Sequence, residues 1–256
     1  MALSNNTIKY IKSLHLRKFR QKYNNFIVEG DKISREILQQ TKFEVETLYA
    51  LPEWLAANQD LLTGREKRIQ EINEGALSKI STLRSPNQVL VVLKQHTPRV
   101  EEQVLRSNFS LYLDNIQDPG NMGTMLRIAD WFGIPYVFCS QNCVERWSPK
   151  VIQASMGAFL RVESPAVALT ELIQKVPDLP IYGATLNGSN IFQTTFAAAG
   201  IIVIGNESKG ISPEIGALVR QQIAIPSGPG GAAESLNAAV ATGIIVAVIK
   251  NLPSKG

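Results

Sequence analysis

The stretch that decides the fold is "NIQDPGNMGTMLRIADWFGI", residues 115–134. It follows an apolar run, "FSLYLD", and leads into a segment whose apolar residues recur at helical spacing. A strand that feeds a helix through a tight turn is typical of an α/β domain. Such turns often bind phosphate, but this one has neither the G-x-G-x-x-G nor the G-x-x-x-x-G-K-[ST] pattern. It carries instead Asn121, Gly123 and Arg127, which places an amide and a guanidinium on the first turns of the predicted helix.

The same alternation of strand and helix continues to the end of the chain. The strand candidates after residue 108 are "FSLYLD", "PYVFCS", "FLRVE", "IYGATL", "IIVIGN" and "QIAIP". Apolar strands that alternate with helices favour a mostly parallel sheet covered by helices on both faces. We therefore predict one α/β domain over residues 109–256.

A smaller α/β unit is predicted before it, over residues 1–94. Its strand candidates are "NFIVEG", "FEVETLYA" and "QVLVVLK", with helical segments between them. The segment 95–108, "QHTPRVEEQVLRSN", is polar, charged and interrupted by Pro98, so we interpret it as the linker.

Composition excludes several classes of protein. Hydrophobic residues make up 45% and charged residues 19% of the 256 residues, as in ordinary globular domains. No apolar run is long enough to span a bilayer, and no secretory signal opens the chain, so a cytoplasmic protein is expected. The only cysteines are Cys139 and Cys143, which are too few for a disulfide framework or a convincing zinc site. No metal is expected.

Positive charge is concentrated at the beginning of the chain. Residues 1–28 contain no acidic residue and six basic ones: Lys9, Lys12, Arg17, Lys18, Arg20 and Lys22. Such a segment is suited to a phosphate backbone, and we take these six residues as RNA-binding candidates. A solvated amphipathic helix and an organelle presequence are alternative interpretations.

Two further glycine-containing loops follow strand candidates. The first is "IIVIGNESKGIS", which includes Gly205 and Glu207, and the second is "IAIPSGPGGAAESLNAAVA", which includes Ser235 and Asn237. Loops at the carboxyl ends of parallel strands form the ligand crevice of an open sheet, so these loops and the first one can converge. Each loop alone has an ordinary explanation, with Glu207 or Ser235 as a helix cap and Asn237 on a helical first turn.

Taken together, the loops resemble the SpoU/TrmH family of RNA 2′-O-ribose methyltransferases, within the SPOUT superfamily. The matching stretches are "NMGTMLR", "SPKVIQASMGAFLRV", "IGNESKGIS" and "IPSGPGGAAESLNAAVA". The first unit resembles that family's RNA substrate-binding domain, a ribosomal-protein-like α/β sandwich whose opening often reads like "NFIVEG". The stretch "SGPGGAAE" departs from the usual pattern in its glycine and proline content.

The resemblance implies a fold, a cofactor and an assembly. Family members have a deep trefoil knot in the C-terminal segment, bind S-adenosylmethionine there in a bent conformation, and are homodimers. By position, the cofactor-binding residues of this sequence are Gly205, Ile225, Leu236 and Thr185. A substrate-binding domain favours ribosomal RNA by family analogy, with transfer RNA as the alternative.

The resemblance also assigns roles to the polar loop residues. Arg127 is expected to hold the phosphate and the 2′-hydroxyl, as a protonated clamp rather than a true base, because guanidinium keeps its proton in proteins. Asn121 is expected to fix the ribose or neighbouring side chains, and Glu207 to orient Arg127 or the loops. Ser235 is expected to contact the substrate or Arg127, and Asn237 to anchor the loop. Two other hypotheses are a non-catalytic RNA-binding protein of the same fold and a nucleotide or dinucleotide enzyme.

Overall fold

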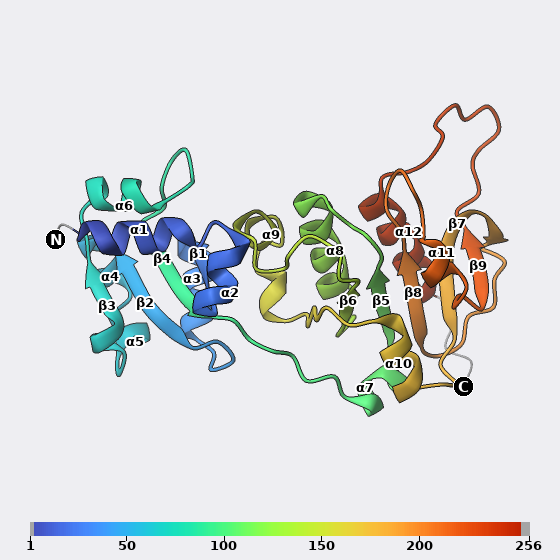
Figure 1. Ribbon diagram of the computed structural model, residues 1–256, viewed down its shortest axis with the longest axis horizontal. Helices are drawn as coiled ribbons and strands as arrows, with labels where there is room; N and C mark the ends of the chain where they lie inside the picture. The colour runs from blue at the N-terminus through green and yellow to red at the C-terminus, as the bar shows by residue number, and fades with distance from the viewer. Residues whose placement is uncertain (1–2, 252–256) are drawn as a thin grey trace. The chain divides into compact units, whose positions relative to one another are not determined.

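The computed structural model describes residues 3–251 and divides the chain into two compact units. Unit 1 comprises residues 1–97 and 145–160, and unit 2 comprises residues 98–144 and 161–256. Each unit contains its own β-sheet, of four strands in unit 1 and five strands in unit 2 (Figure 1).

The sheet of unit 2 is parallel throughout, as the sequence predicts. Its order is β6-β5-β8-β7-β9, and every neighbouring pair is parallel. All residues of the two central strands β5 and β8 are buried, which explains their uninterrupted apolar sequences. The strands are β5 (Phe109–Leu113), β6 (Val137–Cys139), β7 (Ile181–Asn190), β8 (Gly200–Ile204) and β9 (Gln221–Ala224).

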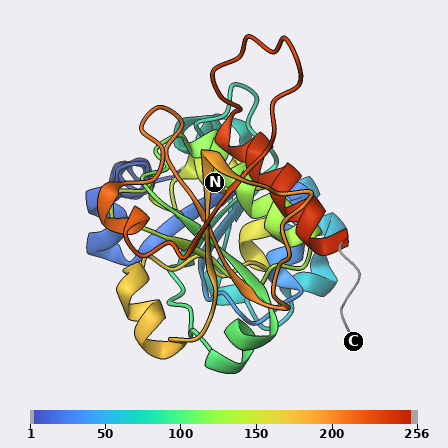
Figure 2. The same cartoon turned by 90° about the vertical axis from the view of Figure 1, so that its right-hand side faces the viewer.

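Helices cover both faces of this sheet. On one face α8 (Pro119–Trp131) and α12 (Ala238–Asn251) pack against each other. The opposite face holds an apolar core to which α7 (Glu102–Ser107), α10 (Leu169–Lys175) and α11 (Pro213–Gly216) contribute. Figure 2 shows α12 on one side of the strands and α10 with α11 on the other.

One local prediction for this half of the chain is wrong. The segment "FLRVE" is not a strand: residues Ala158–Leu160 form a 3-10 helix, η2, and Glu163 forms an isolated β-bridge with Tyr136. The boundary between the two units falls within the expected linker 95–108, whose second half is α7, since Leu105 is completely buried in the core of unit 2. The trefoil knot stays a prediction from the family resemblance.

The sheet of unit 1 is mixed, with the order β1-β4-β2-β3. β4 pairs antiparallel with both β1 and β2, and β3 pairs parallel with β2. The strands are β1 (Asn25–Glu29), β2 (Val45–Ala50), β3 (Ile69–Glu71) and β4 (Val89–Lys94).

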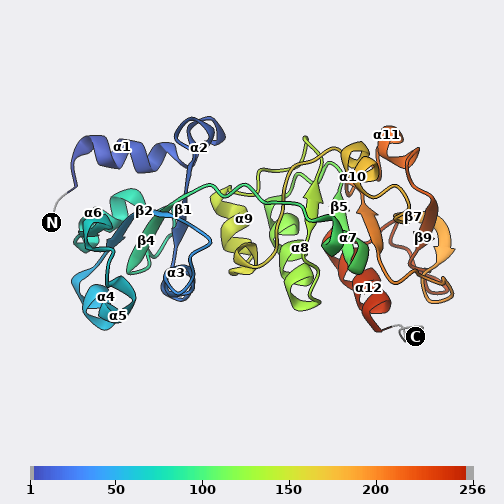
Figure 3. The same cartoon turned by 90° about the horizontal axis from the view of Figure 1, so that it is seen from below.

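Helices sandwich this sheet as well. Figure 3 shows α1 along one side of the strands and α3, α4 and α5 on the other. The core under α1 and α6 includes Ile11, Leu14 and Leu77. The helices are α1 (Asn5–Ser13), α2 (Arg17–Tyr23), α3 (Asp31–Leu38), α4 (Pro52–Ala57), α5 (Gln59–Leu62) and α6 (Glu74–Ile80), with a 3-10 turn, η1, at Glu66–Arg68.

Residues 145–160 pack with unit 1 although the chain reaches them from unit 2. This segment contains α9 (Pro149–Ala154) and η2. The ring of Trp147 stacks on Phe26 with centroids 4.5 Å apart, and Glu145 forms an ion pair with Arg20. The sequence-based division at residues 94 and 109 therefore places this segment in the other domain, since no local pattern reveals its tertiary partners.

Among residues 3–251, no helix is long and apolar enough to cross a membrane. The same described residues contain no group of three or more His, Cys, Asp and Glu side chains that could hold a metal ion.

Candidate functional site

The first turn of α8 begins the site, and its geometry follows from the sequence "DPGN". Asp118 is the N-cap, and its Oδ1 accepts a hydrogen bond from the backbone N–H of Asn121 at 2.7 Å. Pro119 occupies the first turn, where its missing N–H costs nothing. The cap fixes the backbone of Asn121, so its half-buried side chain is aimed from a rigid helix start.

The side chain of Asn121 joins the three predicted loops. Its Nδ2 donates a hydrogen bond to Oε1 of Glu207, in the loop after β8. Its Oδ1 accepts a hydrogen bond from Nδ2 of Asn237, just before α12, at 3.0 Å. Three of the five candidate catalytic residues thus form one hydrogen-bonded chain, which we call the amide relay (Asn237–Asn121–Glu207).

Arg127 lies outside the amide relay. It is exposed on α8, and its side chain has no hydrogen bond or ion pair with any residue in the part of the chain that the structure describes. Six positions separate it from Asn121, which corresponds to a rotation of about 240° around an α-helix. Glu207 bonds to Asn121 and so connects two of the loops, and the guanidinium of Arg127 is left available for an anionic ligand.

The loop after β8 is latched to the end of β5 by residues that sequence analysis does not single out. Asp114, only 2% exposed, accepts a hydrogen bond from the N–H of Ser212 at 2.7 Å. Asn206 donates through Nδ2 to the carbonyl of Asn115 at 2.9 Å. Its Oδ1 accepts from the N–H groups of Ser208 and Lys209. These bonds hold Glu207 opposite Asn121. The sequence does contain one indication of this contact, since a carboxylate, Asp114, directly follows the buried strand β5.

Glycine is required at position 205 for a reason that the sequence alone does not reveal. A Cβ at this position would lie 2.3 Å from the backbone carbon of Gly210 and from the nitrogen of Ile211. The loop folds back on itself, with Asn206 and Gly210 joined by a pair of backbone hydrogen bonds of 2.9 Å. Glycine is therefore required here by the loop's own backbone, and not primarily by the approach of a ligand.

The loop between β9 and α12 extends away from the sheet (Figures 1 and 2). Residues 226–237 are all exposed, Ser235 among them. Asn237, rather than Ser235, caps α12: its Oδ1 accepts from the N–H groups of Ala239 at 3.0 Å and Val240 at 3.2 Å. The interpretation of Ser235 as an N-cap is wrong, because α12 begins at Ala238.

Two of the candidate cofactor residues, Gly205 and Ile225, directly follow β8 and β9. Thr185 lies within β7, and Leu236 lies in the exposed loop just before α12. The hydroxyl of Thr185 is 3.4 Å from Oε1 of Gln222, which ties β7 to β9, and Ile225 is half-buried just past β9. Leu186 beside them is 73% exposed, and Leu236 is 45% exposed. Exposed apolar side chains suit the adenosine part of S-adenosylmethionine, so this set of residues fits the cofactor.

Two buried thiols lie behind the first loop. Cys143 donates from Sγ to the carbonyl of Leu113, the last residue of β5, at 3.2 Å. A hydrogen bond from Cys139 is the main reason that the pKa of Cys143 is lowered to about 7. Burial raises the pKa of Tyr112, on β5, to about 12, so that ring stays a neutral core residue.

The basic segment of unit 1 separates into exposed and buried residues. Five of the six RNA-binding candidates are exposed: Lys9, Lys12, Arg17, Lys18 and Lys22. Arg20 is a correction, because its side chain is 3% exposed and bonds to Glu145 and to the carbonyl of Leu14. A guanidinium buried in an internal ion pair is not available to a phosphate, and we remove Arg20 from the set.

Comparison with known proteins places both halves of the chain. Residues 108–247 match the SpoU rRNA Methylase family, and residues 5–91 match the MRM3-like substrate binding domain. The chain is 29% identical over 245 residues to the 23S rRNA (guanosine(2553)-2′-O)-methyltransferase RlmP of Bacillus subtilis, covering 94% of this chain and 95% of the relative.

Solved structures agree over nearly the full length. A TrmH-family protein from Porphyromonas gingivalis is 34% identical with a TM-score of 0.85, covering 97% of this chain and 98% of that one. An AdoMet-bound rRNA methyltransferase from Sinorhizobium meliloti has the same fold, with 23% identity, a TM-score of 0.84 and coverage of 98% and 96%. With its parallel sheet, its joined loops and a family match over more than half of its length, the chain belongs to the SpoU rRNA methylase family of RNA methyltransferases.

Proposed function

We propose that this protein transfers a methyl group from S-adenosylmethionine to a ribose 2′-hydroxyl of ribosomal RNA. The observation that carries the proposal is the amide relay, which joins three loops that lie far apart in the sequence. On the same helix, the guanidinium of Arg127 has no partner among residues 3–251. The Bacillus subtilis relative, which aligns with this chain over 95% of its length, is named as a 23S rRNA 2′-O-methyltransferase, and that name supports ribosomal RNA as the substrate.

Arg127 is proposed to bind the RNA. Methyl transfer breaks the bond between sulfur and methyl, releases S-adenosylhomocysteine, and forms a bond to the 2′-oxygen. The 2′-hydroxyl is a poor nucleophile until its proton leaves, which at this exposed site passes to water, and the adjacent phosphate is anionic. A guanidinium presents several N–H donors in one plane, so it can hold the phosphate and also stabilise charge that develops on the 2′-oxygen. Its exposure and its lack of partners among the described residues support this role.

The amide relay is proposed to position rather than to react. Asn121 uses its donor for Glu207 and its acceptor for Asn237, so both ends of the amide have a partner. The relay fixes the loops after β8 and before α12 relative to α8. Ser235, whose hydroxyl is exposed in the last of these loops, is proposed to contact the substrate.

The cofactor is proposed to lie against Gly205, Ile225, Leu236 and Thr185. When bound, S-adenosylmethionine supplies an electrophilic methyl group. The residues of this chain provide the apolar surface, through Leu236 and its neighbour Leu186, and the rigid strand ends against which an adenosine can rest.

A homodimer in the cytoplasm is the proposed assembly and location. Trp131 at the end of α8 is 86% exposed, and Val240 on α12 is 52% exposed. These two helices pack together, and α12 carries no charged residue before Lys250. Exposed apolar residues on adjacent helices favour burial against a second copy; a monomer by light scattering at micromolar concentration would exclude it.

Two measurements test the function. Isothermal calorimetry with S-adenosylmethionine and with S-adenosylhomocysteine should show one site per chain, with thermal stabilisation by both ligands. Mapping of 2′-O-methyl groups in ribosomal RNA from cells with and without the protein should reveal one lost position. Absence of cofactor binding, or an unchanged methylation map, would refute the proposal.

A further inference from the structure

Helix α2 presents two aromatic rings next to two ammonium groups. Phe19 and Tyr23, one helical turn apart, stack with centroids 6.2 Å apart and an interplanar angle of 13°. Lys18 Nζ lies 4.9 Å from the centroid of Phe19, and Lys22 Nζ lies 5.4 Å from that of Tyr23. Tyr23 is 40% exposed, so its ring is open to a ligand. This set (Lys18, Phe19, Lys22, Tyr23) is the aromatic platform.

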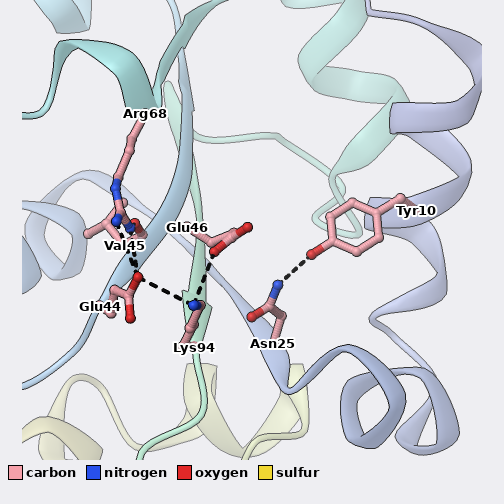
Figure 4. A network of polar contacts seen from close by, with 7 residues as sticks. All are labelled: Tyr10, Asn25, Glu44, Val45, Glu46, Arg68 and Lys94. Carbon is pink, nitrogen blue, oxygen red and sulfur yellow. Dashed lines mark hydrogen bonds and ion pairs between the residues drawn. The ribbon is translucent and has the colours of Figure 1, made fainter.

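The aromatic platform is supported by contacts with Tyr10 of α1. Tyr10 of α1 meets Tyr23 edge to face, with centroids 5.1 Å apart at 82°. Asn25, only 5% exposed, donates from Nδ2 to the hydroxyl of Tyr10 at 2.6 Å (Figure 4). A ring that is fixed before binding loses little conformational entropy when a ligand stacks on it.

Acidic side chains nearby are already neutralised. Figure 4 shows Lys94 between Glu44 and Glu46, at 3.4 Å and 3.9 Å, with Arg68 on the other side of Glu44 at 3.2 Å. Residues 3–28 contain no acidic residue. The face of α1 and α2 therefore keeps the uncompensated charge of five exposed basic residues: Lys9, Lys12, Arg17, Lys18 and Lys22.

We propose that the aromatic platform binds an unpaired segment of RNA, with one base stacked on Tyr23 and the flanking phosphates on Lys18 and Lys22. A base that covers the ring displaces the ammonium of Lys22 from it and frees that ammonium for the adjacent phosphate. Stacking requires an accessible base face, which unpaired nucleotides offer and the interior of an RNA helix does not. The inference rests on the proposed function because it takes RNA as the substrate.

An anionic membrane is the competing partner for a basic amphipathic segment. Membrane-binding helices bury a broad apolar face in the lipid. Here Ile11 of α1 and Leu14, the C-cap residue of that helix, are completely buried in the core. Among the described residues of this segment, only Leu16 and Tyr23 are exposed large hydrophobic residues. The observations favour RNA.

Fluorescence anisotropy of the full-length protein with a labelled single-stranded oligouridylate tests the proposal. Tyr23→Ala should raise Kd about 5- to 100-fold without changing the salt dependence, because a stacking contact is lost and no charge. Lys18→Ala should lower the slope of log K against log salt by about 0.7, the value for one phosphate contact on a single strand. Lys67→Ala, at an exposed lysine outside the platform, is the matched charge control and should change neither quantity.

Further variants keep the test independent of folding. Tyr23→Phe should bind as the wild type does, whereas Tyr23→Leu should lose affinity although it retains an apolar side chain. Tyr23→Trp should give a new indole fluorescence that the oligouridylate quenches. Circular dichroism confirms that each variant is folded.

The outcomes are distinct. Equal affinity of Tyr23→Ala and wild type, equal affinity of the wild type for a duplex and for the single strand, or binding to phosphatidylserine vesicles without binding to RNA would each overturn the inference. Cofactor binding and RNA methylation by the wild-type protein are measured alongside. If they are present while the Tyr23 variants behave as wild type, the inference fails and the proposed function stands.

Discussion

Asn121→Asp tests the amide relay with the smallest possible change. Aspartate has the same shape as asparagine, but it has two acceptors and no donor. The bond from Asn237 survives, because position 121 still accepts it. The bond to Glu207 is lost and replaced by two carboxylates in contact.

The structure sets the size of the effect. A hydrogen bond to a charged group contributes about 1.5–3 kcal/mol. Two carboxylates about 4 Å apart near a protein surface repel by up to about 4 kcal/mol before salt screening. Both residues are half-buried, so screening removes much of the repulsion. A net loss of about 2–3 kcal/mol in transition-state stabilisation corresponds to a fall of about 30- to 150-fold in kcat/KM.

The pH dependence gives the effect a signature. A like charge raises the pKa of one member of a carboxylate pair, so one proton is shared as the pH falls. That proton restores a donor between positions 121 and 207. Activity of Asn121→Asp relative to wild type should therefore be lowest at alkaline pH and recover as the pH is lowered. The assay is single-turnover transfer of a radiolabelled methyl group to ribosomal RNA.

A double variant supplies the control. In Asn121→Asp with Glu207→Gln, the amide at position 207 can donate to the carboxylate at position 121, which also still accepts from Asn237. The relay is then complete with one bond reversed, and the thermal transition of unit 2 and cofactor affinity should return to wild-type values. Wild-type activity of Asn121→Asp at all pH values, or no coupling between the two substitutions in a double-mutant cycle, would refute the relay.

Three further predictions concern other parts of the molecule. Arg127→Ala should lower the methyl-transfer rate by about a hundredfold or more. Arg127→Lys keeps the charge but loses the planar fork of donors, so it should retain measurable but reduced activity, with no new ionisation in its pH–rate profile; equal activity of Arg127→Ala and wild type would remove Arg127 from the mechanism. Glu145→Ala should lower the free energy of unfolding of unit 1 by about 3–5 kcal/mol in urea, because Arg20 is only 3% exposed and loses its ionic partner. Glu102→Ala, in the exposed pair with Arg106, should lower it by less than about 1 kcal/mol, and similar losses in both variants would contradict the burial argument. Burial lowers the pKa of His15 in the folded protein below the ordinary histidine pKa of about 6.5. The unfolded chain therefore takes up a proton first as the pH falls below about 6.5, and the folded state loses stability. The free energies of unfolding at pH 7 and pH 5 should differ less in His15→Gln than in wild type.

The sequence by itself determined most of the strands, the fold class and the family, although it missed the short strand β3 and indicated a strand at "FLRVE" that does not form. The runs of β5 and β8 are apolar at every position because both faces of a central parallel strand are buried, and that local pattern needs no tertiary information. The three loops could be found because glycines and polar residues directly follow those strands, and parallel strands bring their carboxyl ends to one edge.

Only the tertiary structure decided which polar residues meet. Asn121, Glu207 and Asn237 are separated by 86 and 116 positions, and nothing local distinguishes their partnership from the pairing of Glu207 with Arg127. In the same way, the sequence around Arg20 does not distinguish it from its exposed basic neighbours, because its ionic partner, Glu145, lies 125 positions later in the chain. Periodicity reports which face of an element is buried, whereas the partner of a buried charge or amide depends on how distant segments pack. For that reason the motifs of the sequence indicate a methyltransferase, whereas the amide relay, the hydrogen bond at Asp114 and the packing of residues 145–160 within unit 1 follow only from the tertiary structure.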